Sequence, residues 1–484
     1  MPRYFGTDGV RGVANSELTC AMAFTLGVAA VELLGPRLVI GRDTRRSGPM
    51  LEAALVAGIT SAGGDALLAG VVPTPAVALL IREFSASGGV VISASHNPPE
   101  YNGIKFFDAQ GFKLTCELED AFEQRLQRGQ GDTKGDDTRG TVSDTKGDTK
   151  GTVSFVSKDT KETVPFVSSP FVSPQPTGMK IGTVIPLEDA TERYVTHAVN
   201  IVRSQGLDLA GLHIAVDCGH GASFAATPEA LRRLGAKVTA INTDFDGSDI
   251  NVNCGSTHLE QLRELVAQTG ADAGIAHDGD ADRMLAVDAA GNEIDGDVIE
   301  AICAVDLKER GMLAHDTVVS TIMCNIGFTL AMQKQQIRVV QTEVGDSHVL
   351  AAMRKGGFIL GGEQSGHTIL LEYNSTGDGL ASALQLLAIM KRRQTSLGNL
   401  SQVMVKYPQE HINVKVAHKE ALGSSKNLAE ATRESEGRLG GQGRVLIRAS
   451  GTEPLVRVMV EAADEQTARD EAQRLADVVK QELG

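Results

Sequence analysis

Three aspartates stand at alternate positions in the short loop HDGDADR, which occupies residues 277–283. The loop follows the apolar run ADAGIA, which is typical of a buried strand. Because alternate side chains of an extended segment point the same way, we expect Asp278, Asp280 and Asp282 to converge. Converging carboxylates repel one another unless a cation neutralises them, and their hard oxygen atoms suit Mg²⁺. The spacing therefore predicts a magnesium site, beside which Arg283 could hold an anion.

A second polar loop, SASHNPPEYNGIKFF at residues 93–107, follows the apolar run GGVVI. It lies where a strand ends, which is the edge of an open α/β sheet at which ligands bind. Ser95 stands beside His96 and is a candidate nucleophile, and Lys105 follows on an expected returning strand. Taken alone, the same residues would also suit a polar turn held by side-chain hydrogen bonds.

The loop GGEQSGH at residues 361–367 follows a third apolar run, GFIL. Glu363, Ser365 and His367 again occupy alternate positions and are interleaved with glycines. They offer donors and acceptors suited to sugar hydroxyls or an amine, and His367 could act as an acid or base. By itself the segment would also be compatible with a glycine-rich turn that carries a surface histidine.

The fourth loop, RASGTEPLVRVMVEA at residues 448–462, combines two arginines with small polar residues. Arg448 and Arg457 supply planar, bidentate donors. The tight turn between them adds hydroxyl and backbone N–H groups, contributed by Ser450, Gly451 and Thr452. This composition predicts a phosphate-binding loop, although one that lacks the GxxxxGK[ST] pattern of a P-loop.

A single cleft shared by the four loops would explain why a metal site, a serine nucleophile, a hydroxyl-binding loop and a phosphate site occur in successive blocks of the chain. Such a cleft suits phosphoryl transfer, in which a protein acts mainly by positioning groups and neutralising charge. The expected small-molecule partner is therefore a sugar phosphate.

The elements that must position these loops form a repeated pattern of apolar runs, glycine-containing turns and helical stretches. Apolar runs that alternate with helices predict mixed, mostly parallel sheets buried on both faces. The pattern occurs three times, which predicts α/β domains over residues 1–187, 188–292 and 293–401. Alternating strands and a long helix follow, so residues 402–484 are expected to form a smaller α+β domain. The four domains would surround one central cleft.

Composition excludes several classes of partner. The 484 residues carry a formal net charge of −15, which argues against nucleic acid or an anionic membrane because both attract basic surfaces. The six cysteines are scattered without a CxxC pair, which favours reduced thiols in the cytoplasm. The sequence shows neither a signal-peptide core nor a run of about 18 apolar residues, so no membrane segment is expected.

One segment does not follow this pattern. Residues 131–177 repeat DTK, GTVS and FVS and are rich in Asp, Thr, Lys, Gly and Ser. This composition predicts a low-complexity insertion in a surface loop of the first domain. Long surface loops add little closure entropy, so the domain should tolerate it.

In this order, the four loops resemble those of the α-D-phosphohexomutase superfamily, along nearly the whole chain outside the insertion. The opening YFGTDGVRG and the sugar loop GEQSGH are similar to the bacterial phosphoglucosamine mutase subfamily. The resemblance implies interconversion of glucosamine 6-phosphate and glucosamine 1-phosphate through a phosphoserine enzyme and a bisphosphorylated sugar. It also implies one Mg²⁺ per chain and a hexose 1,6-bisphosphate activator. A monomer and a homodimer both remain open.

The resemblance further implies a role for each candidate residue. Ser95 would carry the phosphoryl group and would hold the metal together with Asp278, Asp280 and Asp282. Arg11 and Lys105 match positions near the transferred phosphoryl group, and Lys105 or His367 would assist proton transfer. The candidate substrate-binding residues are His96, Arg283, Glu363, Ser365, His367, Arg448, Ser450, Gly451, Thr452 and Arg457.

Three alternatives remain open at this point. The same machinery could act on neutral hexose phosphates, as a phosphomannomutase or phosphoglucomutase does. A phosphatase or kinase could use an aspartate of the 277–283 loop as nucleophile, although the Ser95 loop would then have no role. A non-catalytic sugar-phosphate sensor would be expected to lack Ser95 or the aspartates, and all of them are present.

Overall fold

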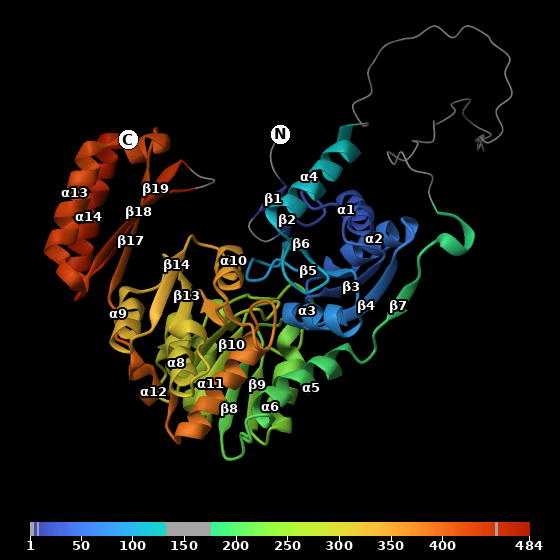
Figure 1. The fold of residues 1–484 in the computed structure, drawn as a ribbon, viewed down its shortest axis with the longest axis horizontal. Coiled ribbons are helices and arrows are strands. Elements are labelled where there is room, and N and C mark those ends of the chain that lie inside the picture. Colours follow the sequence, from blue (N-terminus) through green and yellow to red (C-terminus); the bar gives the residue numbers. More distant parts are fainter. Residues whose placement is uncertain (1–3, 7–8, 132–175, 451–453) are drawn as a thin grey trace, which may run out of the picture.

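The computed structural model describes residues 4–6, 9–131, 176–450 and 454–484 (Figure 1). Four sheets follow one another along the chain, the first three with helices around mixed sheets and the last antiparallel. This arrangement confirms the predicted fold class. Nearly all of the predicted insertion lies outside the described residues.

The first sheet has the strand order β1-β2-β6-β5-β3-β4-β7. Strands β5, β3, β4 and β7 are parallel neighbours, whereas β1, β2 and β6 pair antiparallel. The strands are β1 (Phe5–Gly6), β2 (Gly9–Val13), β3 (Arg37–Arg42), β4 (Asp65–Val71), β5 (Gly88–Ile92), β6 (Tyr101–Phe107) and β7 (Val184–Pro186).

Helices cover both faces of this sheet, because its central strands bury residues on both sides. Leu38 and Ile40 of β3 pack with residues of α1 (Cys20–Leu33), α2 (Gly48–Ser61) and α4 (Cys116–Gly131). The intervening Val39 packs in another cluster with residues of α3 (Thr74–Glu83). Burial on both faces is the pattern expected of strands flanked by parallel neighbours.

The second sheet has the order β12-β11-β10-β8-β9 and the third the order β14-β13-β15-β16. The second is formed by β8 (His213–Asp217), β9 (Lys237–Ile241), β10 (Ala273–His277), β11 (Met284–Asp288) and β12 (Glu293–Ile294), with α5 (Ala190–Arg203), α6 (Ala226–Arg233) and α7 (Glu260–Thr269). The third is formed by β13 (Thr317–Thr321), β14 (Arg338–Thr342), β15 (Leu360–Gly362) and β16 (Thr368–Leu370), with α8 (Gly296–Glu309), α9 (Ile326–Lys334), α10 (Asp346–Gly356), α11 (Gly379–Arg393) and α12 (Leu397–Leu400).

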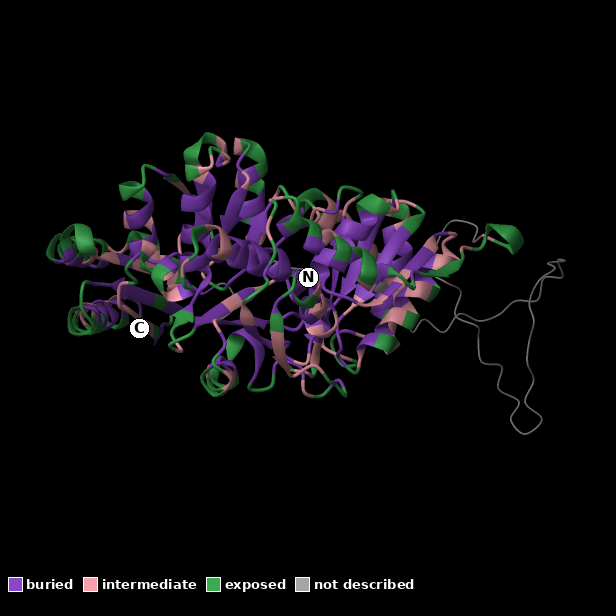
Figure 2. Ribbon diagram, turned by 90° about the horizontal axis from the view of Figure 1, so that it is seen from below, coloured by how far each residue is buried: buried purple, intermediate pink, exposed green. Residues whose placement is uncertain are grey.

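One apolar core is continuous through these three units. It includes Val39 of the first sheet, Ile275 of the second and Val318 of the third, all fully buried. Figure 2 shows buried strands through the middle of this region and exposed residues on the outer turns of its helices. The shared core holds the loops of the three sheets in fixed relative positions. Within the described part of the chain, no helix combines the length and apolar character that crossing a bilayer requires.

The fourth unit has its own core and stands at the edge of the molecule, in red at the left of Figure 1. Its antiparallel sheet has the order β17-β19-β18. The elements are β17 (Gln409–Lys415), α13 (Lys426–Leu439), β18 (Arg444–Ala449), β19 (Leu455–Glu461) and α14 (Glu465–Leu483). The three strands and the final helix follow the sequence pattern, whereas α13 was not predicted.

All four polar loops share one structural setting. Each joins two antiparallel strands: β5 to β6, β10 to β11, β15 to β16, and β18 to β19. In the first three cases the leading strand is also paired in parallel with a neighbour on its other side. The loops therefore leave the carboxyl ends of sheet strands and return at once along antiparallel strands.

Candidate active site

Ser95 lies between β5 and β6 and is almost fully buried. Its hydroxyl donates a hydrogen bond of 2.6 Å to Oδ2 of Asp278, in the loop between β10 and β11. The predicted nucleophile and the predicted metal loop are therefore in direct contact, although they come from different sheets. Gly279 permits this approach, because a Cβ atom there would lie 2.7 Å from the Ser95 carbonyl oxygen.

The backbone of Ser95 has a φ of 51°, a left-handed conformation that a serine rarely adopts. Three neighbours hold it there. The buried Arg45 donates to the Ser95 carbonyl at 3.0 Å, Asn251 donates to the same oxygen at 2.8 Å, and the Ser93 hydroxyl accepts from the Ser95 N–H at 2.9 Å. Such strain persists only where the surroundings fix the residue. The Ser95 side chain is thus held in one direction, toward the metal loop.

Arg45 is a structural residue that the sequence analysis missed. Its guanidinium also donates to the Asn97 carbonyl at 2.7 Å and forms a fully buried ion pair of 2.9 Å with Asp43. Asp43 accepts in turn from the Ser93 hydroxyl at 2.6 Å. The only signal in the sequence is the cluster of charges in RDTRR, directly after an apolar run, which usually suggests a solvated turn.

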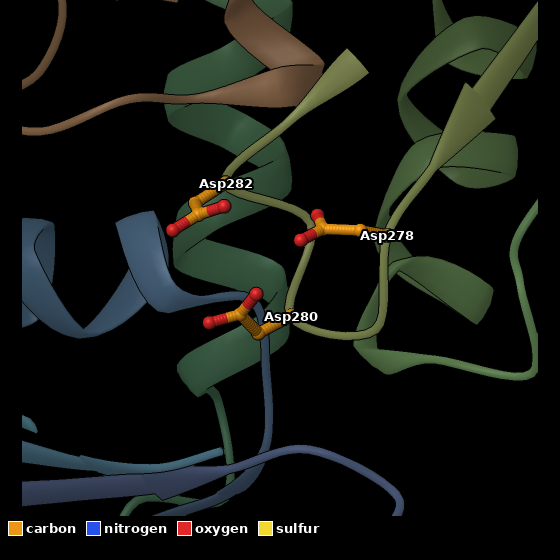
Figure 3. Close-up of side chains that lie close together, drawn as sticks. All are labelled: Asp278, Asp280 and Asp282. Atoms are coloured by element: carbon orange, nitrogen blue, oxygen red, sulfur yellow. The ribbon is translucent and has the colours of Figure 1, made fainter. Parts of the chain in front are cut away.

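The carboxylates of Asp278, Asp280 and Asp282 face one another in Figure 3, with ligand atoms all within 4.8 Å. All three are buried. The predicted convergence is present, but the predicted cause is wrong, because the loop is not extended. It turns tightly between the strands, and Ala281 has a φ of 55°.

This cluster has the electrostatics of a cation site. Burial, followed by repulsion from Asp282 and Asp280, raises the pKa of Asp278 to about 8. Burial opposes ionisation of Asp282 as well, but Lys105 and His367 keep the pKa of that carboxyl below its usual range. Two buried oxygens, Oδ1 of Asp280 and Oδ1 of Asp282, have no hydrogen-bond partner among the described residues. Unpartnered, buried carboxylate oxygens fit a hard cation such as Mg²⁺.

Lys105 lies on β6, as predicted, and is buried beside the aspartates. Its Nζ atom is 2.8 Å from Oδ2 of Asp280 and 3.8 Å from Oδ2 of Asp282. The contacts place a cationic group at the edge of the acidic cluster. Lys105 therefore neutralises part of the negative charge that a phosphoryl group at Ser95 would meet.

His96, Arg283 and Arg11 lie on the open side of Ser95. The His96 Nδ1 atom is 3.3 Å from the Ser95 hydroxyl oxygen and 3.1 Å from the Arg283 guanidinium. Burial, followed by the charges of Arg283 and Arg11, lowers the pKa of His96 to about 4. Arg11 donates to the Asn97 side chain at 3.3 Å. These groups combine a neutral imidazole with two positive charges, which suits an anionic group at Ser95.

Only some residues of the predicted sugar loop lie near Ser95 and the three aspartates. His367 is buried, with Nδ1 3.6 Å from Asp282 and Nε2 3.3 Å from Asp346. Burial alone would lower its pKa, but the two carboxylates raise it. Glu363 accepts a hydrogen bond of 3.1 Å from the N–H of Gly345. Ser365 is exposed at the tip of the hairpin and does not line the cavity described next.

A cavity of about 380 Å³ lies over these side chains. Residues of three sheets line it, including Arg11, His96, Asp282, Arg283, Glu363 and His367. Lys113 and Asp346 also line it and form an ion pair with each other across two sheets. Neither residue could be predicted from the sequence, because each stands alone in its segment without a repeated spacing.

The described residues of the predicted phosphate loop do not line this cavity. Arg448 and Arg457 face each other across β18 and β19, and burial followed by the charge of Arg457 lowers the pKa of Arg448. Ser450 is buried, whereas Gly451 and Thr452 lie outside the described residues. Among the described residues that line the cavity, none comes from the fourth unit.

A small set of polar contacts joins the fourth unit to the third sheet. Arg444 donates to the carbonyls of Ile322 at 3.0 Å and Cys324 at 2.7 Å. Glu461 accepts from the N–H of Ile326 at 3.1 Å and pairs with Arg444 at 2.9 Å. These contacts join the fourth unit to the third sheet through Arg444 and Glu461.

The chain matches models of the phosphoglucomutase/phosphomannomutase family in all four of its parts. Alpha/beta/alpha domain I matches residues 2–132, domain II residues 192–291, domain III residues 295–407, and the C-terminal domain residues 412–478.

Curated relatives match over the full length. The chain is 48% identical to a phosphoglucosamine mutase of Symbiobacterium thermophilum, covering 100% of both chains. It is 46% identical to a phosphoglucosamine mutase of Clostridium acetobutylicum, covering 99% of both chains.

Solved structures share the fold. A phosphoglucomutase/phosphomannomutase family protein of Burkholderia thailandensis aligns with a TM-score of 0.77 at 22% identity, covering 99% of this chain and 98% of that one. The N-acetylphosphoglucosamine mutase of Aspergillus fumigatus, solved with GlcNAc-6P and magnesium, aligns with a TM-score of 0.66 at 18% identity, covering 99% and 96%. With four family models matched in order and relatives at 46–48% identity from end to end, the chain belongs to the phosphoglucomutase/phosphomannomutase family, as the resemblance of its loops predicted.

Proposed function

We propose that this chain is a phosphoglucosamine mutase, an isomerase that interconverts glucosamine 6-phosphate and glucosamine 1-phosphate. The observation that carries the proposal is the 2.6 Å hydrogen bond from Ser95 to Asp278, because it joins a serine nucleophile to an acidic cluster. The curated relatives with that name, at 46–48% identity, support the choice of substrate. Activity on neutral hexose phosphates, with the same machinery, is the alternative.

In the proposed reaction Ser95 carries a phosphoryl group. The C1 hydroxyl oxygen of glucosamine 6-phosphate attacks the phosphorus, the bond from phosphorus to Ser95 Oγ breaks, and the hydroxyl proton is transferred to Ser95 Oγ with the assistance of Lys105 or His367. The bisphosphorylated sugar then reorients in the cleft, so that its other phosphate faces Ser95. Ser95 Oγ attacks the phosphorus on O6, and O6 takes up the proton. Glucosamine 1-phosphate leaves, and the phosphoserine is restored.

Charge neutralisation supports this chemistry, because a phosphoserine carries about −1.5 to −2 charges at pH 7. Asp278, Asp280 and Asp282, together with the phosphoserine, would hold one Mg²⁺ per chain. When bound, the cation polarises the transferring phosphoryl group. Arg11, Lys105 and Arg283 supply the remaining positive charge at this end of the cavity.

Sugar and phosphate recognition is assigned to the remaining candidates. Glu363, Ser365 and His367 would bind the sugar, and His96 and Arg283 would contact the transferring group. The non-reacting phosphate would be held by Arg448, Ser450, Gly451, Thr452 and Arg457. This assignment requires the fourth unit to close over the cavity, which would also exclude the water that could hydrolyse phosphoserine.

We also propose the domain division of the chain, its activator and its location. We divide the chain into domains at 1–187, 188–292, 293–401 and 402–484. We also assign a hexose 1,6-bisphosphate as the activator. A cytoplasmic location agrees with the cysteines of the described residues, all of which are free thiols.

The test is turnover of glucosamine 6-phosphate beside glucose and mannose phosphates, with Mg²⁺ and a catalytic amount of glucose 1,6-bisphosphate. A kcat/KM about tenfold or more in favour of the amino sugar is expected, since one charged hydrogen bond supplies that discrimination. Preference for a neutral sugar would refute the substrate assignment and leave the mutase chemistry in place. Absence of turnover on every hexose phosphate would refute the mutase itself.

A further prediction concerns the phosphate loop. Arg457→Ala should raise KM for the sugar phosphate about 10- to 100-fold, because one charge-assisted hydrogen bond contributes about 1.5–3 kcal/mol. The kcat should change little if the guanidinium binds the non-reacting phosphate equally in the ground and transition states. Steady-state kinetics give both constants. Arg438→Ala, on α13 of the same unit, is the matched control, and an equal effect there would contradict the assignment.

A further inference from the structure

Thr74 is a buried residue at the start of α3 that the proposed chemistry does not use. It belongs to the first sheet unit, yet it contacts the metal loop of the second. Its hydroxyl donates a hydrogen bond of 2.7 Å to Oδ2 of Asp280, and its N–H donates one of 2.9 Å to the Asp280 carbonyl. Side chain and backbone together fix Asp280 from the neighbouring domain.

These contacts divide the two carboxylate oxygens of Asp280 between different partners. Oδ2 accepts from Thr74 at 2.7 Å and from Lys105 at 2.8 Å. Oδ1 is buried and has no hydrogen-bond partner in the described structure. A carboxylate whose one oxygen is held by two donors cannot rotate freely, so its other oxygen keeps one direction. Oδ1 is therefore the oxygen that remains available to a cation.

The Thr74 hydroxyl does not serve to cap the helix α3. The residue before it, Pro73, occupies the N-cap position of α3, and no side chain makes a capping hydrogen bond there. Pro75 already favours a helix start, because its fixed φ angle suits the first turn. The hydroxyl is instead committed to Asp280, although solvent does not reach it.

We infer that Thr74 is a positioning residue for the metal, one that orients Asp280 so that Oδ1 binds the cation. The inference rests on the metal site of the proposed function and adds a residue to it. Partners that orient a metal ligand commonly contribute 10- to 100-fold to metal affinity. Here the partner comes from the unit that carries Ser95, so the hydrogen bond also sets the metal loop relative to the phosphoserine loop.

The experiment measures metal binding directly, without sugar. Mn²⁺ is titrated into the metal-free, dephosphorylated full-length protein, and free Mn²⁺ is followed by electron paramagnetic resonance. Thr74→Val removes the hydroxyl with little change of volume, and Thr74→Ser retains it. Thr317→Val, at an equally buried threonine on β13, is the matched control for loss of a buried hydroxyl.

For Thr74→Val we expect the dissociation constant for Mn²⁺ to rise about 10- to 100-fold, with Thr74→Ser and Thr317→Val within about threefold of wild type. At saturating metal, the KM of Thr74→Val for sugar phosphate should stay within about threefold of wild type, because the sugar site is intact. Should Thr74→Val fail to fold, Thr74→Ala takes its place in the same comparison with Thr74→Ser.

The outcomes separate this inference from the proposed function. Wild-type affinity in Thr74→Val would overturn the role of Thr74 and leave the metal site in place. An equal loss in Thr74→Ser would overturn it as well, since the hydroxyl would then not be the cause. If wild-type protein itself binds no Mn²⁺, the metal site of the proposed function fails together with the inference.

Discussion

Ser95→Ala is expected to lower mutase turnover by about 10⁴-fold or more, because removal of a nucleophile eliminates the covalent route. The protein should remain folded. The hydroxyl contacts the side chains of Asp278 and His96, while Arg45 and Asn251 hold the backbone of residue 95 through its carbonyl oxygen. Those backbone contacts do not depend on the side chain. The loss should therefore appear in kcat and in phosphoryl uptake rather than in stability.

Two measurements check this result. Coupled turnover of glucosamine 6-phosphate gives the activity, and incorporation of label from ³²P-labelled glucose 1,6-bisphosphate gives the phosphoenzyme. Wild-type protein should take up label on Ser95 and Ser95→Ala should take up none. Ser61→Ala, on α2 and away from the cavity, is the control and should behave as wild type. Label on an aspartate, with turnover retained in Ser95→Ala, would instead support the phosphatase or kinase alternative.

The positions of the polar loops could be predicted because each follows a recognisable apolar strand. The runs ADAGIA, GGVVI and GFIL indicate strands, and parallel strands bring their carboxyl ends to one edge of a sheet. Contact between Ser95 and Asp278 could not be derived in this way. It depends on how two sheets pack through a common core, and on Gly279 allowing the loops to approach.

The alternating spacing of polar residues did not by itself determine where their side chains lie. Alternation of Asp278, Asp280 and Asp282 suggested an extended segment, but the hairpin between β10 and β11 brings them together by a tight turn. Ser365 alternates with Glu363 and His367 in the same manner, and there the turn leaves it exposed. The alternating spacing therefore identifies candidate site residues within a loop, whereas the conformation of the turn determines which of their side chains lie together.

Residues that act through long-range contacts carry no local signal. Arg45 holds the Ser95 loop from 50 positions away, and Thr74 reaches Asp280 across 206 positions. In sequence, the first is part of a charged turn and the second is a threonine between prolines. The placement of the fourth unit is a similar case, because none of its described residues lines the cavity.

Asp280→Asn is the second substitution with a large expected effect. The amide retains the volume of the carboxylate and can still accept from Thr74, but it removes the negative charge that a cation requires. We expect Mn²⁺ affinity to fall by about 100-fold or more, since a direct ligand should contribute at least as much as its supporting partners. Loss of several kcal/mol of transition-state stabilisation should lower turnover about 10³-fold.

Asparagine is preferable to alanine at this position because of Lys105. Removing the carboxylate leaves a buried ammonium group, and breaking a buried ion pair costs about 3–5 kcal/mol. Lys105 keeps a second carboxylate at 3.8 Å, that of Asp282, and the amide oxygen of asparagine can accept its hydrogen bond. Asp280→Asn should therefore fold, which lets the metal effect be measured separately from stability.

Thermal unfolding with and without Mg²⁺ provides the decisive comparison. A cation that binds only the folded state stabilises it by RT ln(1 + [L]/Kd), so wild-type Tm should rise with Mg²⁺ concentration. Asp280→Asn should lose this rise, and turnover should fall with it. Asp306→Asn, at a buried carboxylate on α8 that pairs with Arg392, should keep the rise even if its Tm is lower throughout. An unchanged response to Mg²⁺ in Asp280→Asn would show that the cation binds elsewhere, and the roles assigned to Asp280 and Thr74 would both have to be withdrawn.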